Sequence, residues 1–178
     1  MITSPILGIP LGILFLAVAF GFLKIYRIPT GGMSPTLQKG DSLIATKTKA
    51  EIGKLQRGDA VVFTVDGLRY RIHRGDPMRG TYVQRIVALP GDTVTIDSGA
   101  VHVNGVRVEM DGRVSQAPMT TVETASFPLV VPEDHLFLMG DNYANSLDSR
   151  YFGPVESSRV THLPRYRILP PSRFGEID

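Results

Sequence analysis

The stretch IPTGGMSPTLQKGD, residues 28 to 41, separates two parts of the chain that have different sequence patterns. Before it, residues 5 to 23 read PILGIPLGILFLAVAFGFL, and no charged residue occurs from Ile2 to Leu23. After it come short runs rich in Val and Ile, bounded by Gly, Asp or Pro, which is the pattern of β-strands. The stretch therefore leads from an apolar N-terminal segment into a β-rich body.

The apolar N-terminal run is long enough, at ~1.5 Å per residue in a helix, to cross most of a hydrocarbon core of ~30 Å. A cleavable signal peptide is the alternative, with Ala17-Val18-Ala19 as its small-residue site. Because no Lys or Arg precedes the run, and because it continues through Leu23, we predict a transmembrane anchor with its juxtamembrane segment at residues 1–27. Lys24 and Arg27 follow the span, which by the positive-inside rule weakly favours a cytoplasmic body.

Composition excludes several classes of function. A chain of 178 residues fits one domain, and the absence of Cys excludes disulfides, thiolate metal sites and a cysteine nucleophile. The net charge is only +2 and the basic residues are scattered, unlike the dense basic surface of a nucleic-acid-binding protein. We predict no nucleic-acid partner, no metal site and no cofactor.

The region after residue 28 is predicted to be mainly β. Strands are expected at residues 41–47, 59–65, 82–88, 93–97 and 135–139. The run VHVNGVRV, residues 101–108, predicts a hairpin, since Asn104-Gly105 suits a type I′ turn. Within a β domain of residues 28–178, we expect a small hairpin insertion at residues 98–132, and the tail after Pro164 shows no sustained period.

Three segments carry the chemistry: IPTGGMSPTLQKGD, then YVQRIVALPGDTV at residues 82–94, then GDNYANSLDSRYFG at residues 140–153. Each alone is explained by a turn or by a polar loop that satisfies its own backbone. In this order behind one apolar segment, and with RGDAVVF at residues 57–63, they resemble signal peptidase I. That family consists of membrane-anchored serine endopeptidases that remove signal peptides from exported preproteins. The resemblance implies a signal-peptidase-like β-sheet body preceded by one N-terminal transmembrane helix.

The resemblance also implies that both catalytic residues are replaced. Alignment on the Met-x-Pro-Thr-Leu motif places the family's nucleophilic serine at Gly32, and alignment on Arg-x-x-x-x-Pro-Gly-Asp places its general-base lysine at Gln84. A Ser-Lys pair needs a hydroxyl to attack the scissile carbonyl and a neutral amine to take its proton. Glycine has no hydroxyl, and a glutamine amide is not a base near neutral pH.

Other residues match the family's supporting positions. Thr30 falls where a hydroxyl helps to form the oxyanion hole, and Ser146 where a serine orients the lysine. Four residues match the side chains that brace the site: Arg85, Asp141, Asp148 and Arg150. Asp148 and Arg150 have an alternative interpretation as an ion pair that supports the loop. We expect Gln84 to hydrogen-bond toward Ser146 without burying a charge.

The sequence leaves two possible functions, one as a binding factor and one as an enzyme. The first is an inactive preprotein-binding or assembly factor of protein export. The second is an active signal peptidase or serine endopeptidase with a non-standard site, built from Ser34 and His73 or completed by a partner. We favour the first because both dyad residues are lost.

The expected partners are an exported preprotein or signal peptide, the lipid membrane, and an active signal peptidase or other assembly partner. The family implies a single-pass protein of the cytoplasmic (inner) membrane with the β domain on the outer side, against the weak charge signal. We also expect Ile28, Met33 and Leu37 to continue into the membrane interface or the cleft.

Overall fold

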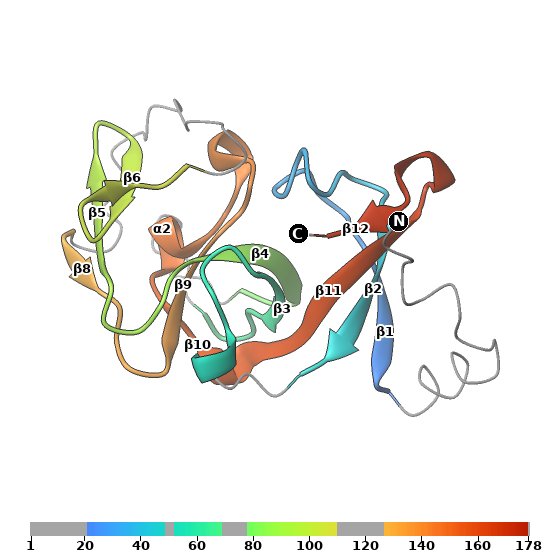
Figure 1. Cartoon of the computed structure of the whole chain (residues 1–178), viewed down its shortest axis with the longest axis horizontal. Coiled ribbons are helices and arrows are strands. Elements are labelled where there is room, and N and C mark those ends of the chain that lie inside the picture. Colours follow the sequence, from blue (N-terminus) through green and yellow to red (C-terminus); the bar gives the residue numbers. More distant parts are fainter. Residues whose placement is uncertain (1–20, 49–51, 69–77, 110–126, 178) are drawn as a thin grey trace, which may run out of the picture.

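A computed structural model describes residues 21–48, 52–68, 78–109 and 127–177 (Figure 1). Within these ranges the protein is mainly β, as predicted, and its strands form two sheets. The larger sheet has eight strands in the order β1-β2-β11-β3-β4-β9-β10, with β12 paired to β11. The smaller has four, in the order β7-β6-β5-β8, and Figure 1 places it at the end of the molecule away from β1 and β2.

All strand pairs described are antiparallel. The larger sheet contains β1 (Leu23–Arg27), β2 (Ser42–Lys47), β3 (Ala60–Thr64), β4 (Thr81–Ala88), β9 (His135–Met139), β10 (Val155–Glu156), β11 (Val160–Leu169) and β12 (Gly175–Glu176). The smaller contains β5 (Thr93–Asp97), β6 (Ala100–Val103), β7 (Val106–Arg107) and β8 (Leu129–Val130). The helical elements are α2 (Ser149–Phe152), η1 (Ile52–Lys54), η2 (Tyr143–Asn145), η3 (Ser157–Arg159) and η4 (Pro171–Arg173).

The five strands predicted from sequence are confirmed, with ends that differ by one residue at most. The predicted hairpin is confirmed as β6 and β7, and its two central residues, Asn104 and Gly105, have φ values of 52° and 79°. Positive φ at both positions is what a type I′ turn requires. The sheet of this hairpin also contains β5, which lies before the expected insertion at residues 98–132. Residues 110–126 of that insertion lie outside the described ranges.

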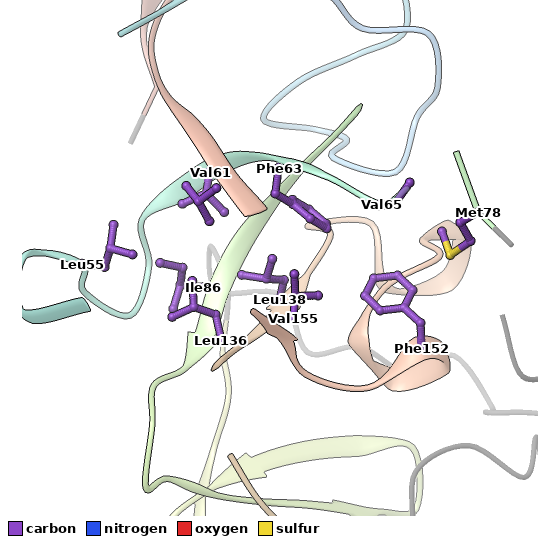
Figure 2. Close-up of a cluster of buried hydrophobic side chains, with 11 residues drawn as sticks. Leu55, Val61, Phe63, Val65, Met78, Ile86, Leu136, Leu138, Phe152 and Val155 are labelled. Atoms are coloured by element: carbon purple, nitrogen blue, oxygen red, sulfur yellow. The ribbon is translucent and has the colours of Figure 1, made fainter. Parts of the chain in front are cut away.

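The core is divided between the two faces of the central strands. On β9, Leu138 belongs to a cluster shared with Phe63 of β3 and Val155 of β10, which Figure 2 shows. The next residue, Met139, belongs to a second cluster that packs against the small sheet. Because successive side chains of a strand point to opposite faces, a strand covered on both faces is apolar throughout. This explains the continuous apolar run LFLM in β9, whose residues are all 0% exposed.

A third cluster holds the loop of residues 28–41 against the large sheet. Its members are Ile28, Met33, Leu37, Leu43, Ala45 and Val62, so the loop's apolar residues pack on β2 and on one face of β3. Ile28, Met33 and Leu37 are 6%, 3% and 0% exposed. These side chains therefore pack in the core and are not presented to a membrane interface, whereas Ile28 and Met33 also line a groove, which was the other expectation for them.

The C-terminal tail fastens the same loop. Arg173 of η4 donates from Nη2 to the carbonyl oxygens of Pro35 at 3.2 Å and Thr36 at 3.3 Å, and to Asp41 Oδ2 at 3.0 Å. Arg167 of β11 donates to the Thr36 carbonyl at 2.5 Å. Two arginines separated from the loop by more than a hundred residues thus satisfy its carbonyl groups. The sequence pattern of the tail gave no indication of this arrangement.

The predicted membrane span, residues 5–23, lies outside the described ranges except for its last three residues, of which Leu23 begins β1. The segment predicted as juxtamembrane contains β1, which pairs with β2 from Leu23 opposite Thr46 to Arg27 opposite Ser42. Among the described residues, no helix combines the length and hydrophobicity that a membrane span needs.

The clamp of the tail on the loop predicts that Arg173→Gln lowers the free energy of unfolding by about 1–3 kcal/mol, because Asp41 is left with one partner fewer in a buried position. The measurement is urea unfolding of the full chain in non-ionic detergent. Arg165→Gln is the matched control, since Arg165 is exposed on β11, and it should change stability by less than about 0.5 kcal/mol. Equal losses in the two variants would contradict the clamp.

Candidate active site

A groove of about 720 Å³ opens between the loop after β1 and the start of β4. Residues 26–30 with Gly32 and Met33 form one wall, residues 79–84 form the other, and residues 144–147 with Tyr151 complete the lining. The structure thus brings Thr30, Gly32, Gln84 and Ser146 together in one groove, although they come from three separate segments.

The backbone at Gly32 is held by the loop that follows β9. The amide of Asn142 donates to the Gly32 carbonyl at 3.0 Å, and the Asn142 side chain donates to the Gly31 carbonyl, also at 3.0 Å. Gly140 makes this approach feasible, because a Cβ there would lie 2.3 Å from both the Gly32 carbonyl oxygen and Ser146 Oγ. Only glycine fits at position 140 without displacing one of the two loops.

Gly32 itself is under no such constraint. A Cβ built on Gly32 would lie 3.7 Å from the Asn145 carbonyl oxygen and 3.8 Å from Ser146 Oγ, which are ordinary contact distances. Its backbone is not in the left-handed region either. A side chain at position 32 would therefore be accommodated beside Ser146, and packing does not explain why the residue is glycine.

Gln84 lies on β4 and is 2% exposed. Its Nε2 donates to the Leu147 carbonyl at 2.6 Å, so the hydrogen bond expected toward Ser146 is instead made with the neighbouring backbone. The Gln84 Oε1 is buried without a hydrogen-bond partner in the described structure. A buried acceptor left unpaired costs about 1–3 kcal/mol, so this end of the groove holds an unused acceptor.

Arg85 and Asp141 join the walls of the site. The guanidinium of Arg85 donates to both carboxylate oxygens of Asp141 at 2.9 Å, and Thr36 donates from Oγ1 to Asp141 Oδ2 at 2.5 Å. Arg85 also donates to the Gly58 carbonyl at 2.6 Å. The pair connects β4 and the loop after β9 with the loop of residues 28–41.

Asp148 and Arg150 form a buried ion pair within their own loop, at 0% and 2% exposure. Arg150 donates from Nε and Nη2 to the two Asp148 oxygens at 2.8 Å, and from Nη2 to the Tyr143 carbonyl at 2.9 Å. Burial alone would lower the pKa of Arg150, but the hydrogen bonds and attraction to Asp148 outweigh it, and the net pKa is raised. Asp148 also caps α2, and neither residue lines the groove. Their contacts are those of a loop support.

The alternative nucleophile and base are placed differently. Ser34 lies in a turn, where its backbone amide donates to the Gly31 carbonyl at 3.0 Å. It is not among the residues that line the groove. His73 lies outside the described residues. Within the described part of the chain, no three His, Asp or Glu side chains gather as metal ligands would.

A family model described as "Signal peptidase, peptidase S26" matches residues 3–167. The chain belongs to this signal peptidase family. The signal peptidase I of Bacillus licheniformis is 32% identical over 178 residues, which cover 97% of this chain and 87% of that protein. Signal peptidase I T of Bacillus subtilis (strain 168) is 31% identical over 164 residues, covering 89% and 80% of the two chains. A crystal structure of a signal peptidase I from Enterococcus faecalis V583 has 28% identity and a TM-score of 0.44, and covers 62% of this chain and 96% of that one.

The sequence did not predict which residues of this signal peptidase family member hold the loop of residues 28–41 against the loop after β9. Asn142 was interpreted only as part of a polar loop, and Gly140 was not singled out. A glycine directly after the buried strand β9 could have indicated a close backbone approach. The hydrogen bond from Gln84 to the Leu147 carbonyl could not be predicted from sequence, because any residue offers the same backbone carbonyl.

The contact at Gly140 predicts that Gly140→Ala destabilises the protein by about 1–3 kcal/mol, since the added methyl group overlaps the Gly32 carbonyl and the Ser146 side chain. Gly53→Ala is the matched control, because a Cβ at Gly53 meets no atom within 4 Å. Thermal and urea unfolding of both variants would measure the difference. If Gly140→Ala were as stable as Gly53→Ala, the close approach described above would be incorrect.

Proposed function

We propose that this signal peptidase family member is a catalytically inactive factor that binds or assembles preproteins at the cytoplasmic membrane. One observation carries the proposal. Among the described residues that line the groove there is no Lys, His, Asp or Glu. No side chain in that lining would therefore take a proton near neutral pH, and a hydroxyl such as that of Ser146 or Thr30 stays protonated and a poor nucleophile.

Binding does not need the missing groups. Only stabilisation of the transition state depends on a nucleophile and a base, whereas an extended peptide is held by contacts with the walls of a groove. Those walls are supported by Arg85 with Asp141, by Asn142 and by the C-terminal clamp, all of which are present. The protein would thus hold an exported segment, with its apolar N-terminal segment in the membrane and its β body on the outer side.

The alternative function is an active endopeptidase that uses Ser34 with His73, or a base that a partner supplies. Ser34 would have to leave its turn to reach the groove. A partner base is the stronger form of this alternative, because the hydroxyl-bearing residues Thr30 and Ser146 already line the groove. Preprotein cleavage that requires Ser34 would favour it.

The proposal predicts that Gly32→Ser and Gln84→Lys together create an endopeptidase, while neither does so alone. Position 32 accepts a side chain beside Ser146, and a lysine at position 84 would be buried, which lowers the pKa of its amine and favours the neutral base. Members of a catalytic unit act non-additively, so activity should be confined to the double variant and should rise with pH as the amine loses its proton.

The measurement is cleavage of a preprotein with small residues before the cleavage site, using wild type, both single variants and the double variant. Cooperative unfolding of each variant controls for folding. A folded but inactive double variant would show that the site differs at more than these two residues. Cleavage by the wild type at the rate of the double variant would refute the inactive-factor proposal.

A second prediction is binding without turnover. A signal peptide with a photoreactive residue should crosslink to the wild type near Gly32 and remain intact, because the groove persists without its reactive centre. Mass spectrometry would locate the crosslink and detect cleaved peptide. Steady cleavage that Ser34→Ala abolishes would support the alternative function instead.

A further inference from the structure

The charged side chains that line the groove are all positive within the described residues. They are Arg27, the last residue of β1, and Arg79, which lies just before β4. Both are exposed, and neither forms an ion pair with another described residue. No described residue of the lining carries a carboxylate, so an extended ligand would meet these two guanidinium groups.

Neighbouring groups add to the positive potential along the β1 wall. The ammonium of Lys24 lies 5.1 Å from the ring centroid of Tyr26, which lines the groove. The Tyr26 hydroxyl is 2.9 Å from Nδ1 of His162. Burial lowers the pKa of His162, and repulsion from Lys24 and Lys47 lowers the pKa further. This wall already disfavours one more positive charge.

A carboxylate does lie near the other wall. Asp66 accepts from the amide of Gly80 at 2.8 Å, so it approaches the residue next to Arg79. Its carboxylate keeps its negative charge, but it does not line the groove and makes no ion pair with Arg79. Among the described residues, Arg27 and Arg79 are therefore the charged side chains of the lining itself.

Both arginines have the same spacing from the dyad positions. Arg27 precedes Gly32 by five residues, and Arg79 precedes Gln84 by five residues. In an extended chain, five residues span roughly 17 Å. The β4 wall is extended from Thr81, so a ligand that runs along it from Gln84 would present a residue about five positions away to Arg79. The chain from Ile28 to Gly32 is a loop, so on that wall the equal sequence spacing fixes no distance.

Resting on the proposed function, we infer that the groove selects an extended peptide that carries an acidic side chain about five residues from the residue facing Gly32. Its carboxylate pairs with Arg79 at the start of the β4 wall, Arg27 adds a second positive charge on the other wall, and the apolar part of the segment occupies the remainder of the groove. A lysine at that position is disfavoured by the same charges. This requirement is a determinant of client choice, and it does not depend on whether the client is cleaved.

The test measures binding of fluorescent peptides to the full chain in non-ionic detergent. The peptides share one apolar sequence, and a single Glu, Gln or Lys is moved along it; a photoreactive residue identifies which position faces Gly32. The Glu peptide should bind more tightly than the Gln peptide, and the Lys peptide less tightly, with the largest difference about five positions from the crosslink. Added salt should reduce the difference.

Variants assign the preference to the two arginines. Arg27→Gln and Arg79→Gln should each lower the Glu preference by about two- to fivefold, the range of exposed ion pairs, and the double variant should lose it. Arg107→Gln is the matched control, because Arg107 is an exposed arginine of β7 outside the groove lining. It should retain the preference in full.

The outcomes separate this inference from the proposed function. Equal binding of Glu and Gln peptides by the wild type, or a Glu preference that persists in the double variant, would overturn the acidic-client inference and leave peptide binding intact. Failure of the folded wild type to bind any of the peptides would overturn the proposed function, and this inference with it.

Discussion

The backbone of Gly140 passes so close to the carbonyl of Gly32 that a methyl group cannot fit between them. This contact joins two loops that are more than a hundred residues apart in the chain, and the amide of Asn142 adds a hydrogen bond to the same carbonyl. Elsewhere in the same loop, Leu37 is packed into the core and Arg173 satisfies carbonyl groups. The loop that forms one wall of the groove is thus held at several points.

The ion pairs of the site have structural reasons that do not involve catalysis. Arg85 and Asp141 connect β4 with two loops, and Asp148 and Arg150 hold the loop after β9 in its conformation. Removing one partner of a buried pair leaves an uncompensated charge and costs about 3–5 kcal/mol. A chain without the dyad would still need these residues to keep its groove. Their presence in the sequence therefore indicates the fold of the site. It does not indicate whether the site is catalytically active.

The sequence was most informative where one local signal determines structure. The Val- and Ile-rich runs gave the strands to within one residue, and Asn104-Gly105 gave the hairpin turn. It was least informative for β11, whose second half alternates charged and apolar residues after Pro164 and pairs with β2 from the other end of the chain. The partner of Gln84 was equally beyond prediction, because β-strand register and loop position together decide that the nearest acceptor is a backbone carbonyl. Long-range pairing, and not propensity, decides such features.

Gln84 shows how a polar side chain is held at a buried position of the groove lining. A lysine at 2% exposure would be desolvated, and without a serine at position 32 its amine would have no hydroxyl to activate. The amide avoids any buried charge and ties one end of itself to the Leu147 carbonyl, but it leaves Oε1 unpaired. An amide at position 84 thus places a polar group at this buried point of the groove lining without burying a charge there.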